Sequence, residues 1–127
     1  MHLSEALDRL EALGTAKMRA QNAKRGVAGD QYGVKMGDIR TVAKEIKTDH
    51  GLALELWDSG HFEARLLAIL VMKPKHLSAT ELDRMVRSNT LAQVADWLGS
   101  YVIKVHPEKE KLRQQWMESD HPMAARA

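Results

Sequence analysis

Apolar residues recur at intervals of three and four positions along almost the whole chain, and this is the period of an α-helix. Ile39, Val42, Ala43 and Ile46 form the clearest of these stripes. No segment alternates apolar and polar residues with the period of two that a half-buried strand needs. We therefore expect an all-α protein.

Turn and capping residues divide this pattern into helices of about 8 to 15 residues each. The sequence Ser78-Ala79-Thr80-Glu81 is a capping box, in which the serine hydroxyl and the glutamate each satisfy an amide at the start of a helix. We expect eight or nine helices, the clearest of them over residues 3–13, 16–24, 37–46, 52–57, 62–72, 78–88, 91–105 and from 107 onward. A last one starts after Ser119-Asp120-His121-Pro122.

The predicted helices follow one another in pairs every 35 to 45 residues or so, the spacing of HEAT-type repeats. A stack of helix pairs is favoured over a closed bundle because each repeat contacts mainly its neighbours. We expect residues 1–127 to form a single domain. The last predicted helix, 123–127, has barely one turn, so we also expect an incomplete stack whose open C-terminal end could mediate self-association.

Several function classes are disfavoured by composition. The chain has no cysteine, which removes thiol nucleophiles and disulfides, and none of its six histidines are spaced as two ligands on one helix face. We expect neither a metal ion nor another cofactor. The longest apolar run, 66–72, is too short for a bilayer, and the first residues lack the features of a secretory signal, so a cytoplasmic location is expected.

Basic residues gather in one part of the sequence. Residues 17–47 contain eight Lys or Arg against three acids, although the whole chain has a formal charge of only +2. Arg40, Lys44 and Lys47 follow helical spacing and are predicted to form a cationic ridge beside the apolar stripe. Such a ridge could follow a phosphate backbone or could simply be solvated, and the pattern leaves both interpretations open.

Three segments in the first half carry a resemblance to a known family. They are Tyr32-Gly33-Val34-Lys35-Met36-Gly37-Asp38-Ile39-Arg40 with Ala43-Lys44-Glu45-Ile46-Lys47, then residues 50–60, then Phe62-Glu63-Ala64-Arg65-Leu66-Leu67-Ala68. In order and spacing they resemble the opening blocks of the DNA alkylation repair family. The resemblance implies a HEAT-like repeat stack whose basic concave face holds duplex DNA. It also implies a glycosylase that removes N3- and N7-alkylated purines while the lesion stays largely in the base stack.

The same resemblance implies site residues in the second half. The family's Trp-Asp-x-x-Asp motif falls on residues 92–96, where Asp96 matches the catalytic carboxylate that would stabilise an oxocarbenium-like sugar. Ala92 stands in place of the aromatic residue and Gln93 in place of the first acid. Arg126 matches an arginine that binds phosphate beside the lesion.

Other prominent side chains have structural interpretations. Trp57, Trp97 and Trp116 lie within or beside apolar stripes and are expected in the core, with Trp97 the one candidate for DNA contact. Glu63 and Arg65 are expected to hold neighbouring repeats together through a partly buried ion pair.

Three functions of different classes therefore remain. The first is a DNA glycosylase, or part of one. The second is a non-catalytic relative that binds duplex DNA by its backbone, and the third is a HEAT-like scaffold that binds protein.

Overall fold

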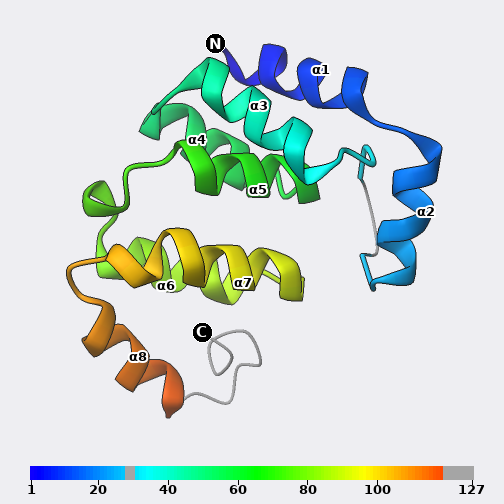
Figure 1. The fold of residues 1–127 in the computed structure, drawn as a ribbon. Helices are drawn as coiled ribbons and strands as arrows, with labels where there is room; N and C mark the ends of the chain where they lie inside the picture. The colour runs from blue at the N-terminus through cyan, green and yellow to red at the C-terminus, as the bar shows by residue number, and fades with distance from the viewer. Residues whose placement is uncertain (28–30, 119–127) are drawn as a thin grey trace. The chain divides into compact units, whose positions relative to one another are not determined.

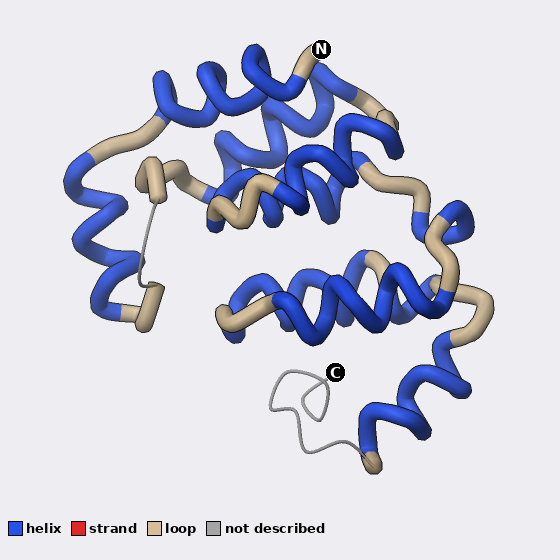
Figure 2. Tube along the Cα trace, turned by 180° about the vertical axis from the view of Figure 1, so that it is seen from behind, coloured by secondary structure: helices blue, strands red, loops and turns tan. Residues whose placement is uncertain are grey.

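The computed structural model describes residues 1–27 and 31–118, and these residues contain helices and no strand (Figures 1 and 2). The prediction of an all-α protein is thus confirmed. In the described ranges, no helix is both long and apolar enough to cross a membrane. The α-helices there are α1 (Leu3–Leu13), α2 (Ala16–Lys24), α3 (Met36–Ile46), α4 (His50–Asp58), α5 (Phe62–Val71), α6 (Ala79–Ser88), α7 (Ala92–Tyr101) and α8 (Lys109–Met117), and the 3₁₀ helices are η1 (Pro74–His76) and η2 (Ile103–Val105).

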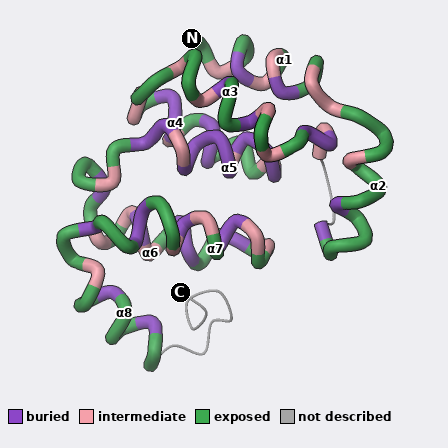
Figure 3. Tube along the Cα trace, viewed as in Figure 1, coloured by how far each residue is buried: buried purple, intermediate pink, exposed green. Residues whose placement is uncertain are grey.

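The chain divides into two compact units, Met1–Met72 and Lys73–Ala127. Helix α5 is the centre of the first unit, because eight of its ten residues are buried. Helices α3 and α4 pack against α5, and α1 packs against all three. Figure 3 shows buried residues along nearly all of α5, as its mostly apolar sequence predicted.

The second unit contains α6, α7 and α8 with the two 3₁₀ helices. The capping box of Ser78 and Glu81 is formed as predicted: the Ser78 hydroxyl accepts the Glu81 amide at 3.0 Å, and the Glu81 carboxylate accepts the Ser78 amide at 3.1 Å. Buried His106 lies 2.9 Å from the carbonyl oxygen of Leu77, which links the segment before α8 to the segment before α6. Trp116 is also buried, as its apolar stripe predicted.

The end of α7 differs from the sequence prediction. Helical spacing continues to Val105, but α7 ends at Tyr101, and a short 3₁₀ helix follows because Val102 adopts φ −116° and ψ −59°. Helix α3 ends at Ile46 as predicted, but Lys47, which was expected to continue the cationic ridge, lies beyond the helix and has a φ of 68°. The predicted last helix, 123–127, lies outside the described residues. That residues 1–127 form a single domain remains a prediction.

Candidate nucleic-acid interface

The exposed side of α3 carries two cations of the predicted ridge. Ile39 and Val42 are fully buried against the first unit, so Arg40 and Lys44, four residues apart, lie together on the solvent side. Lys47 is also exposed, but it does not continue the row, because its positive φ turns the chain away after the last helical residue. The ridge built by the helix therefore consists of Arg40 and Lys44.

An acid next to this ridge is already neutralised. Glu45 accepts a hydrogen bond from Arg9 of α1 at 2.6 Å, and both side chains are about four-tenths exposed. The pair removes a negative charge beside Lys44 that would otherwise repel an anionic partner. Among the described residues, Lys44 itself forms no ion pair.

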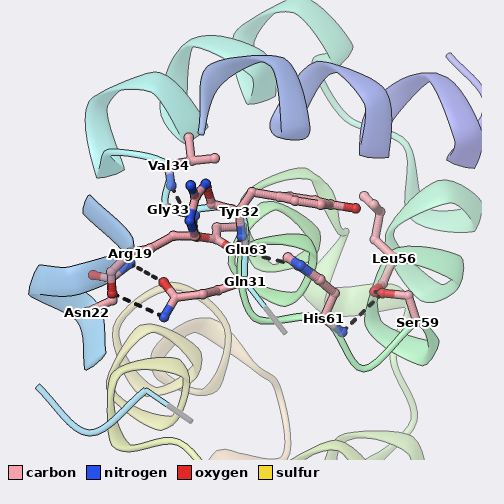
Figure 4. Close-up of polar contacts among 10 residues, drawn as sticks. All are labelled: Arg19, Asn22, Gln31, Tyr32, Gly33, Val34, Leu56, Ser59, His61 and Glu63. Carbon is pink, nitrogen blue, oxygen red and sulfur yellow. Dashed lines mark hydrogen bonds and ion pairs between the residues drawn. The ribbon is translucent and has the colours of Figure 1, made fainter. Parts of the chain in front are cut away.

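The start of α3 is fixed by a carboxylate from another helix. Glu63, fully buried in the first turn of α5, accepts the backbone N–H groups of Tyr32, Gly33 and Val34 at 2.9, 2.9 and 3.1 Å (Figure 4). Hydrogen bonds to an ionised acceptor are about twice as strong as neutral ones. The segment that leads into α3 is thus held against the centre of the unit.

This role of Glu63 differs from the ion pair expected from the sequence. The three amides come from a segment about thirty residues upstream, and no residue type marks them as partners. The one signal in the sequence is an acid within a mostly apolar helix, which requires hydrogen-bond partners if it is buried. His61 lies close to the same carboxylate, with 3.6 Å between its Nδ1 and a Glu63 oxygen, and its ring stacks on Tyr32 at a centroid distance of 4.0 Å.

Gly33 lies where the segment before α3 contacts the start of α2. Its φ is 77°, and a Cβ added there would lie 2.4 Å from the carbonyl oxygen of Thr15 and 2.5 Å from the Arg19 side chain. The close approach allows the Gly33 carbonyl to accept the Thr15 amide at 2.9 Å. Only glycine fits here, because a side chain would push α2 away from the segment before α3.

Arg65 has a packing role. Its guanidinium lies 4.6 Å from the centre of the buried Trp57 ring and donates to the Trp57 carbonyl at 3.1 Å. Burial lowers the pKa of Arg65, and the nearby Asp58 carboxylate partly opposes this shift. Arg65 therefore joins α4 to α5 through Trp57, whereas the sequence predicted an ion pair with Glu63.

The candidate catalytic carboxylate belongs to the second unit. Asp96 lies on the exposed face of α7, one helical turn after Ala92, which is the first residue of the helix and is also exposed. Trp97 is only partly buried, and its ring meets Tyr101 edge-on at 5.6 Å. Of the three tryptophans expected in the core, Trp57 and Trp116 are therefore buried, whereas Trp97 remains accessible.

The remaining expected site residue, Arg126, lies outside the described residues. Arg40, Lys44 and Lys47 belong to the first unit and Asp96 to the second. The structure therefore presents an exposed pair of cations on α3 and an exposed acid on α7.

Comparison with known proteins gives three matches. The model of a family described as "DNA alkylation repair enzyme" matches residues 6–127. "Uncharacterized protein Lin0241" of Listeria innocua serovar 6a is 26% identical over 98 residues, which are 74% of this chain and 43% of the relative.

The third match is to a solved structure. That protein is described as one of "a new family of proteins related to the HEAT-like repeat DNA glycosylases with affinity for branched DNA structures". The match has a TM-score of 0.90 and a sequence identity of 23%. It covers 98% of this chain and 53% of that protein. This chain thus has a HEAT-like helical-repeat fold, and it spans about half the length of both relatives.

Proposed function

The chain belongs to the family of DNA alkylation repair enzymes, and from this we propose that it acts on DNA, binding duplexes through their phosphate backbone. The observation that carries the proposal is the exposed pair Arg40 and Lys44 on α3, whose helix is fixed in place by Glu63. Cations that are held in position bind phosphates with less loss of conformational entropy. Because such contacts release counterions, the binding weakens steeply as salt rises.

The reaction that we propose is the removal of N3- or N7-alkylated purines, with Asp96 as the catalytic carboxylate. An alkylated purine is cationic in DNA, so the bond between its nitrogen and C1′ breaks with the electron pair leaving on a neutral base. The Asp96 carboxylate stabilises the positive charge that develops on the sugar. A water molecule then bonds to C1′ and gives up one proton, which leaves an abasic site.

A second candidate is a relative that binds DNA without cleaving it. The observation that favours it is at the start of α7, where Ala92 and Gln93 stand in place of the aromatic and acidic residues of the family motif. Without an aromatic face beside the sugar, the positive charge that develops on the sugar during base release is stabilised less. The affinity for branched DNA in the description of the structurally similar protein makes branched DNA the substrate to test for this candidate.

One experiment separates these functions. Release of N3-methyladenine and N7-methylguanine from methylated duplex DNA is measured for the wild type and for Asp96→Asn, together with duplex binding at several salt concentrations. Release that the variant abolishes supports the glycosylase. Salt-dependent binding without release supports the non-catalytic relative, for which binding of branched DNA is measured in the same way. The absence of release and of binding to either DNA would exclude DNA as the substrate and leave a protein-binding scaffold.

A further inference from the structure

Helix α2 is not explained by apolar packing. The one buried residue of this helix is Asn22, and its other residues are at least partly accessible. A helix that is polar all round gains little from the hydrophobic effect, which stabilises most helices in proteins. The presence of α2 in the fold therefore needs another explanation.

Polar contacts hold α2 in a defined position. Arg19 donates to the Tyr32 carbonyl at 3.0 Å, and the Asn22 side-chain amide donates to Gln31 at 2.9 Å (Figure 4). The Thr15 hydroxyl accepts the Met18 amide at 3.1 Å and caps the helix. Together with the bond between Thr15 and Gly33, these contacts tie α2 to the segment that Glu63 fixes.

The charged side chains that α2 presents to solvent are all cationic. No acid occurs between Ala12 and Gly29. Lys17, Lys24 and the capping residue Arg25 are exposed, and none of them forms an ion pair within the described residues. Lys17 and Lys24 are seven residues apart, so they share one face about 10 Å apart along the helix.

This surface is separate from the ridge on α3. Figures 1 and 2 both show α2 beside the group formed by α1, α3, α4 and α5, running across the direction of α1 and α3. Anions bound along α2 would therefore follow a different line from anions bound along α3. A linear duplex offers phosphates in one direction, whereas branched DNA offers them in several.

We propose that the face of α2 with Lys17, Lys24 and Arg25 binds the phosphate backbone of a second double-stranded arm of branched DNA. The first arm lies on Arg40 and Lys44. This inference rests on the DNA binding proposed above, and it adds a second backbone site and a preference for branched substrates.

The test compares a linear duplex with a three-way junction of the same total length, using the whole chain. The α2 variant is Lys17→Gln/Lys24→Gln/Arg25→Gln. The charge control, Lys75→Gln/Lys104→Gln/Lys111→Gln, removes three exposed cations from the other unit. A third variant, Lys17→Arg/Lys24→Arg/Arg25→Lys, keeps the charge of α2. Circular dichroism confirms that each variant is folded.

We expect the wild type to prefer the junction, and we expect the α2 variant to lose that preference while it still binds the duplex. Three phosphate contacts account for roughly a 40-fold loss of affinity between 50 and 200 mM salt, and the α2 variant should lack this part of the salt dependence on the junction. The charge control and the charge-preserving variant should resemble the wild type.

Four results would overturn the inference: a wild type without preference for the junction, an α2 variant that retains it, a charge control that loses it equally, or an α2 variant weakened equally on both substrates. The last would place α2 on the same duplex as α3. A wild type that binds neither DNA would instead refute the proposed function itself.

Discussion

The Glu63 carboxylate accepts the backbone N–H of Gly33 at 2.9 Å, although thirty residues separate them in the sequence. Because the same carboxylate also accepts the neighbouring amides of Tyr32 and Val34, one side chain of α5 sets where α3 begins. Gly33 in turn contacts Thr15 through its carbonyl. The positions of both cationic helices, α2 and α3, therefore depend on this contact.

Replacing Glu63 with glutamine should destabilise the protein strongly. The side-chain NH₂ of glutamine would face an amide N–H, which leaves a buried donor without an acceptor and removes the charge from the other bonds. We expect a loss of about 2–4 kcal/mol in the free energy of unfolding, measured by urea denaturation. Glu55→Gln, at an exposed position on α4, is the control and should change stability by less than about 0.5 kcal/mol. Equal effects of the two substitutions would contradict the structure.

Alanine at Gly33 should be far more harmful than alanine at Gly26. Both glycines have a positive φ, 77° and 91°, so both substitutions introduce backbone strain of about 1–3 kcal/mol. Only Gly33→Ala adds a steric clash with Thr15 and Arg19, because the described residues leave open space around a Cβ at Gly26. Thermal unfolding of the two variants should show the larger decrease in Tm for Gly33→Ala. Similar decreases would mean that the contact with Thr15 is looser than the structure shows.

Much of the fold follows from the sequence because burial is periodic. The stripe with Ile39 and Val42 determines which side of α3 is buried and therefore which side exposes Arg40 and Lys44. The place of Lys47 was not predictable in this way, since its positive φ has no signal in the side-chain pattern. The end of α7 was not predictable either, because its apolar spacing continues to Val105 although the helix ends at Tyr101.

The candidate site was predictable only in part. The cations on α3 follow from spacing, but the structural role of Glu63 depends on backbone amides distant in sequence, which periodicity cannot reveal. The catalytic role of Asp96 comes from resemblance to the family. The structure adds that Asp96 is exposed on α7 and leaves its role a proposal.

The contact between Trp116 and Asp83 should stabilise the second unit. The indole N–H donates to the Asp83 carboxylate at 2.8 Å, and Arg87 pairs with the same carboxylate at 2.9 Å. Trp116→Phe should reduce the free energy of unfolding by about 1–3 kcal/mol, partly through the lost hydrogen bond to a charged group. A double-mutant cycle with Asp83→Ala, which removes the acceptor, isolates that bond. A coupling energy near zero would show that the hydrogen bond contributes nothing to stability.

Lys47→Gly should stabilise the protein. The φ of 68° and ψ of −122° at Lys47 lie in a region that glycine adopts readily and other residues avoid. Glycine should relieve about 1 kcal/mol or more of strain, measured by urea denaturation. Lys44→Gly, in the last turn of α3, is the control and should destabilise, because glycine is unfavourable within a helix. A loss of stability in Lys47→Gly would mean that the lysine side chain makes a contribution larger than the strain.

The cations on α3 should contribute to DNA binding as phosphate contacts, without reading the sequence. Arg40→Gln/Lys44→Gln removes two such contacts, so the slope of log affinity against log salt concentration should decrease by about 1.8 for a linear duplex. The decrease should be the same for duplexes of different sequence, because phosphate contacts carry no base information. Fluorescence anisotropy titrations at several salt concentrations measure the slope. Lys75→Gln/Lys104→Gln, with two exposed cations removed from the other unit, is the control for net charge. An unchanged slope in the α3 variant would place the duplex on another surface, and a loss confined to one sequence would indicate base contacts in place of backbone contacts.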